Sequence, residues 1–268
     1  MNILPILLFV TIISVLSSTF AQEKKQNNST NSNTIILNVR GGMQFGVNAN
    51  DFFRPMSAIL QLPKQPDFSL PLSVSVAAKF RTGMWNVGID GGYTSTSVSE
   101  NATVPARILP DTTTVGSRNL SETVSLSLIP VILVAEIVPV ESQFKTYMGV
   151  GAGVGFAGVK WTEKLSSDVP NDIRVGGTLL NETKVIPVFR IYSGIQFGYD
   201  KFAKSSSGSG SVIMEVHYTY APVKVQAFRK FAEQFPVQPP QAFENVQIGA
   251  SAVSLHLGFQ FTLAATQR

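Results

Sequence analysis

Apolar and polar residues alternate one by one along most of the chain after residue 34. In segment 253–263 every odd-numbered residue is apolar, from Val253 to Leu263, whereas the even-numbered positions include Ser254, His256 and Gln260. A period of two places successive side chains on opposite faces of a β-strand. The same alternation is found in segments 35–48, 70–81, 84–98, 120–135, 144–157, 183–199 and 211–220. The pattern therefore predicts an all-β fold of eight strands, with ten as the alternative count.

The links between these segments alternate in length. Links 49–69, 99–119, 158–183 and 221–245 are long, whereas 82–83, 136–143 and 200–210 are short. Short turns at one end and long loops at the other are typical of outer-membrane barrels, and strands of about 9 to 11 residues suit a tilted membrane crossing. We therefore predict an eight-stranded antiparallel transmembrane β-barrel, an up-and-down meander, over residues 34–268. A soluble lipocalin-like barrel, whose apolar face would point inward and bind a ligand, is the alternative fold.

Aromatic residues near the segment ends fit the two interfacial belts of a membrane protein. The belt near the short turns would hold Trp85, Phe144, Tyr147, Tyr199 and Phe261, and the belt near the long loops would hold Tyr93, Tyr218 and Tyr220. Closure of the sheet would leave no open strand edge in the lipid, as a bilayer requires.

Composition narrows the classes of function. The 268 residues are 44% hydrophobic and 14% charged, with a net charge of +4, two histidines and no cysteine, whereas soluble domains are roughly 25% charged. The absence of cysteine excludes a disulfide framework, a zinc–cysteine site and an iron–sulfur cluster, and we expect no cofactor or metal. The basic residues form no run, so no nucleic-acid partner is expected. The apolar stretch 128–140 is too short for a membrane helix and contains Pro130, Glu136 and Pro139.

The N-terminal segment is typical of a secretory signal. Residues 3–16 are apolar, and the small residues Thr19 and Ala21 suit cleavage before Gln22. We predict a signal peptide over 1–21 and a polar linker over 22–33. An uncleaved anchor is the alternative, because no lysine or arginine precedes the apolar run. No cysteine follows it, so a lipid anchor is not expected.

The stretch 127–159 carries a resemblance to a known family. It contains Ile129-Pro130-Val131 and then a strand with glycine at positions 149, 151, 153 and 155. With the aromatic-rich last strand, it resembles the eight-stranded outer membrane β-barrel domain proteins of Bacteroidota-like bacteria. The resemblance implies insertion by the barrel assembly machinery and an outer-membrane location with both termini in the periplasm. Such proteins often end on an aromatic residue, whereas here residues 262–268 follow Phe261.

Charged residues on the inward faces predict a network inside the barrel. These residues are Arg40, Lys79, Asp90, Arg190, Glu215, His217 and His256. Eight strands leave a lumen just wide enough for side chains to fill, and buried charges must pair or remain hydrated. We predict a pairing network that seals the lumen, and a narrow gated channel is the alternative. The alternate glycines of segment 149–155 would provide lumen space or admit a bulky neighbour.

An enzymatic role is the less favoured interpretation. Ser254 and His256 share a face, but Cβ atoms at positions i and i+2 of a strand are about 7 Å apart, which is unfavourable for the hydrogen bond that a nucleophile and its base require. His217 is followed by Tyr218-Thr219, unlike the His-x-Ser pattern of lipid A deacylases. A lipid-modifying enzyme therefore remains only an alternative.

The last long link contains apolar residues at helical spacing. Segment 223–235 predicts a short amphipathic helix on the barrel rim, with Lys224, Phe228, Arg229, Lys230 and Phe231 as its key residues. Its cations would contact lipopolysaccharide phosphates, or the helix would bind a partner. The leading hypothesis is a non-enzymatic outer-membrane barrel with a structural or surface-interaction role through long extracellular loops, whose ligand is unknown.

Overall fold

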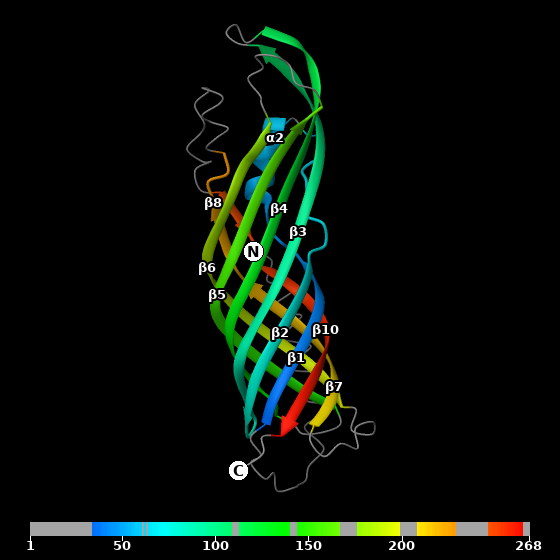
Figure 1. Ribbon diagram of the computed structural model, residues 1–268, viewed down its shortest axis with the longest axis vertical. Helices are drawn as coiled ribbons and strands as arrows, with labels where there is room; N and C mark the ends of the chain where they lie inside the picture. The colour runs from blue at the N-terminus through cyan, green and yellow to red at the C-terminus, as the bar shows by residue number, and fades with distance from the viewer. Residues whose placement is uncertain are drawn as a thin grey trace. The chain divides into compact units, whose positions relative to one another are not determined.

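The computed structural model describes residues 34–60, 62, 64–108, 113–139, 144–166, 176–198, 208–228 and 246–264. Eight strands of this part close into one antiparallel barrel (Figure 1). They are β1 (Thr34–Phe45), β2 (Leu72–Thr82), β3 (Trp85–Ile108), β4 (Thr113–Ile137), β5 (Phe144–Leu165), β6 (Gly177–Gly198), β7 (Gly208–Tyr220) and β10 (Ala252–Ala264). The predicted signal peptide 1–21 and linker 22–33 lie outside the described residues.

The barrel strands follow one another in chain order, and β10 closes the ring against β1. At this seam Thr34 is opposite Ala264, and Thr34 also pairs with Arg81 at the end of β2. The tight turn from β2 to β3 follows, where Gly83 has a φ of 60° that favours glycine. We call this end of the barrel the turn end and the opposite end the cap end. The strand order confirms the predicted eight-stranded meander.

The strands differ in length. β3, β4, β5 and β6 have 24, 25, 22 and 22 residues, whereas β1, β2, β7 and β10 have 11 to 13. The longer strands continue past the short ones toward the cap end (Figure 1). The prediction of long links over 99–119 and 158–183 is therefore wrong for most of these residues. Their serine, threonine and asparagine side chains resemble loop composition, but they pair across a sheet, as Ser99 does with Thr123.

A helix occupies part of the link between β1 and β2, where the sequence predicted only a loop. Helix α2 spans Asn50–Leu60, and its Phe52, Phe53, Met56 and Leu60 are buried. The Asn48 side chain accepts a hydrogen bond from the Asn50 backbone N–H at 3.1 Å, which satisfies a free donor at the start of the helix. None of the described helices is long and apolar enough to cross a membrane.

A small hairpin lies between β7 and β10 in the chain. It consists of β8 (Pro222–Val225) and β9 (Val246–Gly249), with Val223 opposite Ile248. The helix predicted over 223–235 is therefore wrong at its start, because Val223 and Lys224 belong to a strand. Phe228 lies in a turn and is buried. Arg229, Lys230 and Phe231 lie outside the described residues.

Candidate functional site

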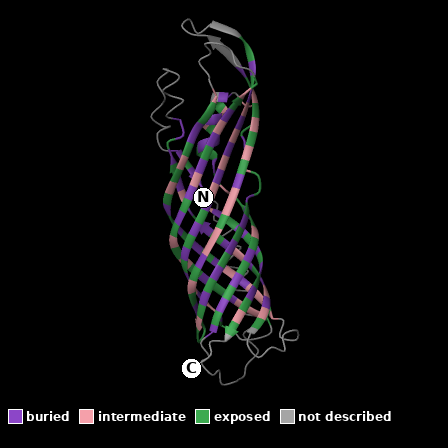
Figure 2. Ribbon diagram, viewed as in Figure 1, coloured by how far each residue is buried: buried purple, intermediate pink, exposed green. Residues whose placement is uncertain are grey.

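The outer surface near the turn end is apolar. Ile89, Leu133, Val150 and Phe259 are each more than half exposed, at 54%, 68%, 56% and 58%. Figure 2 shows exposed and buried residues alternating along the strands. Many further apolar side chains on β1, β2, β7 and β10 are exposed in the same way. An apolar surface of this extent is unfavourable in water and favourable in lipid. We call it the membrane belt.

Aromatic side chains lie at both borders of the membrane belt. Trp85, Phe144 and Phe261 are exposed near the turn end, and Tyr93, Tyr218 and Tyr220 are exposed on the other border. Tyr147 was predicted to join them, but it is buried inside the barrel, so that prediction is wrong. Tyr199 lies outside the described residues.

All seven predicted lumen residues are buried inside the membrane belt, where they lie among apolar side chains such as Ile132 and Val134. Arg40 is the centre of one group: its Nη1 lies 2.7 Å from Glu215 Oε2, and its Nη2 contacts Asp90. Arg190 Nη1 lies 3.2 Å from the same Asp90 carboxylate. Four strands, β1, β3, β6 and β7, are thereby joined across the lumen.

A second group surrounds Glu136, which the sequence placed in a turn. Its carboxylate accepts bonds from Lys79 Nζ and Asn86 Nδ2, each at 2.5 Å, and from the Tyr192 hydroxyl at 3.2 Å. The Tyr147 hydroxyl donates to Glu215 Oε1 at 2.6 Å, and Lys79 Nζ lies 5.7 Å from the centroid of the Tyr147 ring, so Tyr147 contacts both groups. Alternation could have found both missed residues, because Tyr147 shares its face with Gly149, and Glu136 shares its face with Val134.

The charges of the lumen balance. The cations Arg40, Lys79 and Arg190 each contact a carboxylate of Asp90, Glu136 or Glu215. We call these six residues the charge network. Loss of one partner from a buried pair leaves an uncompensated charge, at a cost of about 3–5 kcal/mol. The charge network therefore joins side chains of β1, β2, β3, β4, β6 and β7 across the lumen.

Glycines make room for the large lumen side chains. Gly258 is opposite Arg40, Gly194 is opposite Glu215, and Gly149 is opposite Glu136. A Cβ added at Gly194 would lie 2.5 Å from Tyr147 Cζ and 2.9 Å from Glu215 Cγ. A Cβ at Gly151 would meet Val134 and Ile132 at 3.0 and 3.2 Å. The glycines of β5 thus admit bulky neighbours, as the alternation predicted.

The two histidines stack on each other in the lumen. Their ring centroids are 4.3 Å apart, His217 Nε2 lies 2.7 Å from Glu215, and His256 Nε2 lies 2.9 Å from Ser254 Oγ. Ser254 and His256 are therefore within hydrogen-bond distance, although the spacing of their positions on the strand was unfavourable for it. Glu215 binds His217 rather than His256, so these contacts do not form a nucleophile–base–acid chain. Among the described residues, His, Asp and Glu form no group of three that could hold a metal ion.

An apolar core closes the barrel at the cap end. Phe52 of α2 lies 5.5 Å from the Trp161 ring and 5.6 Å from the Phe228 ring, measured between centroids. Phe53 and Val223 are also buried, and Trp161 Nε1 donates to Glu122. We call this assembly the cap core. The charged residues Arg118, Glu122 and Glu163 are buried in the same part of the sheet.

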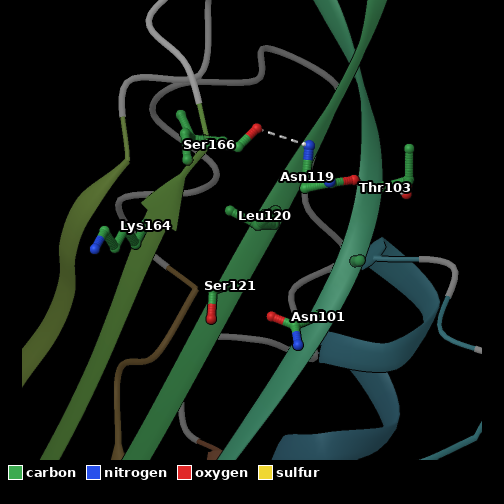
Figure 3. A pocket seen from close by; sticks show the side chains of 9 residues that line it. Asn101, Thr103, Asn119, Leu120, Ser121, Lys164 and Ser166 are labelled. Carbon is green, nitrogen blue, oxygen red and sulfur yellow. Dashed lines mark hydrogen bonds between the residues drawn. The ribbon is translucent and has the colours of Figure 1, made fainter.

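The outward surface of the cap is polar and hollowed. A concavity of about 500 Å³ is lined by Asn101, Ala102, Thr103, Asn119, Leu120, Ser121, Lys164, Leu165 and Ser166. Figure 3 shows these side chains on β3, β4 and the end of β5, with Ser166 bonded to the Asn119 backbone N–H. The sequence did not single out this site, because its residues were assigned to loops.

An apolar belt outside, buried charged residues in the lumen and a closed sheet define the class: the protein is an eight-stranded transmembrane β-barrel of the outer-membrane type. No protein-family model matches the chain. No curated protein matches its sequence. Membership of the bacterial family named above stays a prediction.

Comparison with solved structures found matches of low sequence identity. Neisserial surface protein A (NspA) is 9% identical, with 87% of this chain and 97% of that chain covered and a TM-score of 0.36. Ail, the attachment invasion locus protein of Yersinia pestis, is 9% identical, with 87% and 100% covered and a TM-score of 0.35. The translocator domain of autotransporter NalP from Neisseria meningitidis is 7% identical, with 96% and 95% covered and a TM-score of 0.25. The assignment to the class rests on this chain's own surface and lumen.

Proposed function

We propose that the protein is a non-enzymatic barrel of a bacterial outer membrane that presents its cap end to the cell exterior as a structural and surface-interaction element. The change of polarity along β3 to β6 carries the proposal. These strands are apolar outside in the membrane belt and polar outside in the cap, where an apolar core fills the interior. Such a chain has one part suited to lipid and one part suited to water.

The orientation follows from the connections. In outer-membrane barrels the short turns face the periplasm and the long connections face the exterior. The β2–β3 turn, the start of β1 and the end of β10 all lie at the turn end. Both termini of the barrel would then be periplasmic, which agrees with export by the predicted signal peptide and insertion by the barrel assembly machinery.

The filled interior supports a structural role over a channel. The charge network lies in the lumen, and the cap core lies beyond it along the barrel axis, on the route that a solute would have to follow. A lipocalin-like barrel is incompatible with the structure, because the apolar side chains of the membrane belt point outward. The partners we propose are the lipids around the belt and the lipopolysaccharide of the outer leaflet.

The absence of natural cysteines allows a direct test of topology. Ser117→Cys in the cap and Thr82→Cys at the turn end both replace exposed residues. In intact cells, a membrane-impermeant maleimide should label the first variant, and it should label the second only after permeabilisation. Labelling of Thr82→Cys in intact cells, or extraction of the protein by carbonate, would contradict the proposal.

A further inference from the structure

The outward face of β3 changes chemistry where the membrane belt ends. Below this border the outward residues include Ile89 and Tyr93, and above it they are Ser95, Ser97, Ser99, Asn101 and Thr103. The opposing positions of β4 are Ser127, Ser125, Thr123, Ser121 and Asn119, in the same order. The two strands thus form a ladder of five paired hydroxyl and amide groups. Ser99 Oγ lies 3.0 Å from Thr123 Oγ1 in this ladder.

The neighbouring strand adds positive charge to this surface. Lys160 of β5 is opposite Ser125, and Lys164 is opposite Ser121, and both lysines are exposed. The carboxylates of Glu122 and Glu163 point to the other side and are buried. We call the ladder together with Lys160, Thr162 and Lys164 the outer cap face. Its described positions carry two cations and no carboxylate.

The chemistry of the outer cap face suits an anionic sugar. The concavity at its upper part offers two asparagine amides, three hydroxyls and the Lys164 ammonium beside the apolar Ala102, Leu120 and Leu165. Amides and hydroxyls both donate and accept hydrogen bonds, as sugar hydroxyls require, and an ammonium attracts phosphate. Protein interfaces instead depend on aromatic and arginine anchors, and the described outward positions of this face have none. A sugar with phosphate therefore fits better than a protein partner.

The position of the face identifies the source of the sugar. Ser121 lies six residues beyond Ser127 on β4, which is about 20 Å along the strand and about 14 Å above the belt at a tilt near 45°. The polar headgroup layer of a leaflet is about 5–8 Å thick. The concavity is thus just outside the headgroups, at the depth of sugars that are attached to lipid.

We propose that the outer cap face binds the phosphorylated core sugars of lipopolysaccharide in the leaflet that surrounds the barrel. Lys160 and Lys164 pair with core phosphates, and Asn101, Asn119 and Ser121 bond the sugar hydroxyls. This inference rests on the proposed outer-membrane orientation, which places the cap among these sugars. Exposed contacts of this kind weaken as salt is added, because ions screen them over about 10 Å at 0.1 M.

Binding to defined glycolipids tests the site. The purified full chain in detergent would be titrated with rough lipopolysaccharide, with the same material after dephosphorylation, with lipid A alone and with phosphate-free dextran. We expect the tightest binding to rough lipopolysaccharide and at least tenfold weaker binding to each of the others. If dephosphorylated lipopolysaccharide binds as tightly as the rough form, phosphate has no role in recognition. If lipid A binds as tightly, the site recognises lipid headgroups and not core sugars, and the proposal is wrong.

Charge reversal on one strand supplies the matched control. The double variant Lys160→Glu/Lys164→Glu should bind rough lipopolysaccharide at least tenfold more weakly, whereas Lys145→Glu, near the turn end of the same strand, should bind within twofold of the unaltered protein. Heat-modifiable migration in gels would verify that each variant is folded, and Asn101→Ala/Ser121→Ala tests the concavity without a change of charge. If Ser117→Cys is labelled from outside but the charge-reversed protein binds normally, this inference fails and the proposed function stands. If Ser117→Cys is not labelled, both fail.

Discussion

The membrane belt and the cap are built from the same strands but differ in the chemistry of their outward faces, whereas both interiors contain apolar and charged side chains. On β4, Leu133 points outward into the belt and Glu136 points into the lumen, whereas Ser125 points outward in the cap and Val124 points into the cap core. Both regions alternate with a period of two. The alternation therefore fixes which residues share a face, and the identity of each set decides whether that face meets lipid, water or the interior.

The two regions are also held together differently. The interior of the membrane belt depends on the charge network and on glycines that make room for it. The cap depends on the packing of aromatic rings from α2, β5 and the segment after β8. Ion pairs and hydrogen bonds thus stabilise the interior of the membrane belt, whose outward apolar side chains face lipid. Apolar burial stabilises the region that we place in water.

Removal of a network carboxylate should have the largest effect. Glu215→Leu deprives Arg40, Tyr147 and His217 of their shared partner, and we expect the free energy of unfolding to fall by about 3–5 kcal/mol. Urea titration of the refolded protein in lipid vesicles would measure it. The double variant Arg40→Leu/Glu215→Leu should lose less than the sum of the two single changes. A loss below about 1 kcal/mol for Glu215→Leu would show that the network adds little.

An arginine on the outside of β4 should distinguish lipid from water. Leu133→Arg places a charge on the membrane belt, and we expect it to cost about 2–4 kcal/mol if the site is near the bilayer midplane. Ser125→Arg on the same strand lies in the cap and should change stability by less than about 0.5 kcal/mol. Similar costs at the two positions in the same titration would remove the distinction between belt and cap.

A methyl group added to a lumen glycine should have an intermediate effect. Gly194→Ala brings a Cβ against Tyr147 and Glu215, and overpacking of this kind costs about 1–3 kcal/mol. Gly41→Ala is the matched control, because its added Cβ meets no atom within 4 Å. We expect the control to unfold at nearly the same urea concentration as the unaltered protein. Equal shifts for both variants would contradict the role of lumen glycines.

The smallest effect is expected at the rim of the cap. Lys184 Nζ lies 3.0 Å from Glu182 and donates to the Lys224 carbonyl at 2.6 Å, which ties β6 to β8. An exposed pair contributes about 0.2–1 kcal/mol, so Lys184→Ala should slightly lower the stability of the cap. Hydrogen exchange of β8 should speed up while that of β1 stays unchanged. Faster exchange in both strands would show that the cap and the belt open together.

Sequence alone could assign individual residues to the inward face of a strand for a physical reason. Which face of a strand a residue occupies depends only on the alternating pattern of its own segment, so Arg40, Asp90 and His217 could be assigned to the interior without knowledge of their partners. The pairing of Arg40 with Glu215 depends on the closure of β1 against β10 and on the register of β7, which link residues far apart in the chain. Those contacts could not be read from alternation.

The cap was predicted poorly because its composition resembles that of loops. The serine- and threonine-rich ends of β3 and β4 alternate with apolar residues, but their outward side is polar, so the segments did not look like membrane strands. Helix α2 has a single apolar face and contains Pro55, and the hairpin of β8 and β9 is only four residues on each side. Short elements that pack on a distant core give a weak local signal.

The border between lipid and water on β4 is the most direct test of the central claim. Single cysteines at Ser121, Ser125, Ile129 and Leu133, all outward positions, would each carry an environment-sensitive fluorophore in the protein inserted into vesicles. We expect water-like emission at Ser121 and Ser125 and blue-shifted, lipid-like emission at Ile129 and Leu133. The same emission at all four positions, or a border elsewhere on the strand, would contradict it.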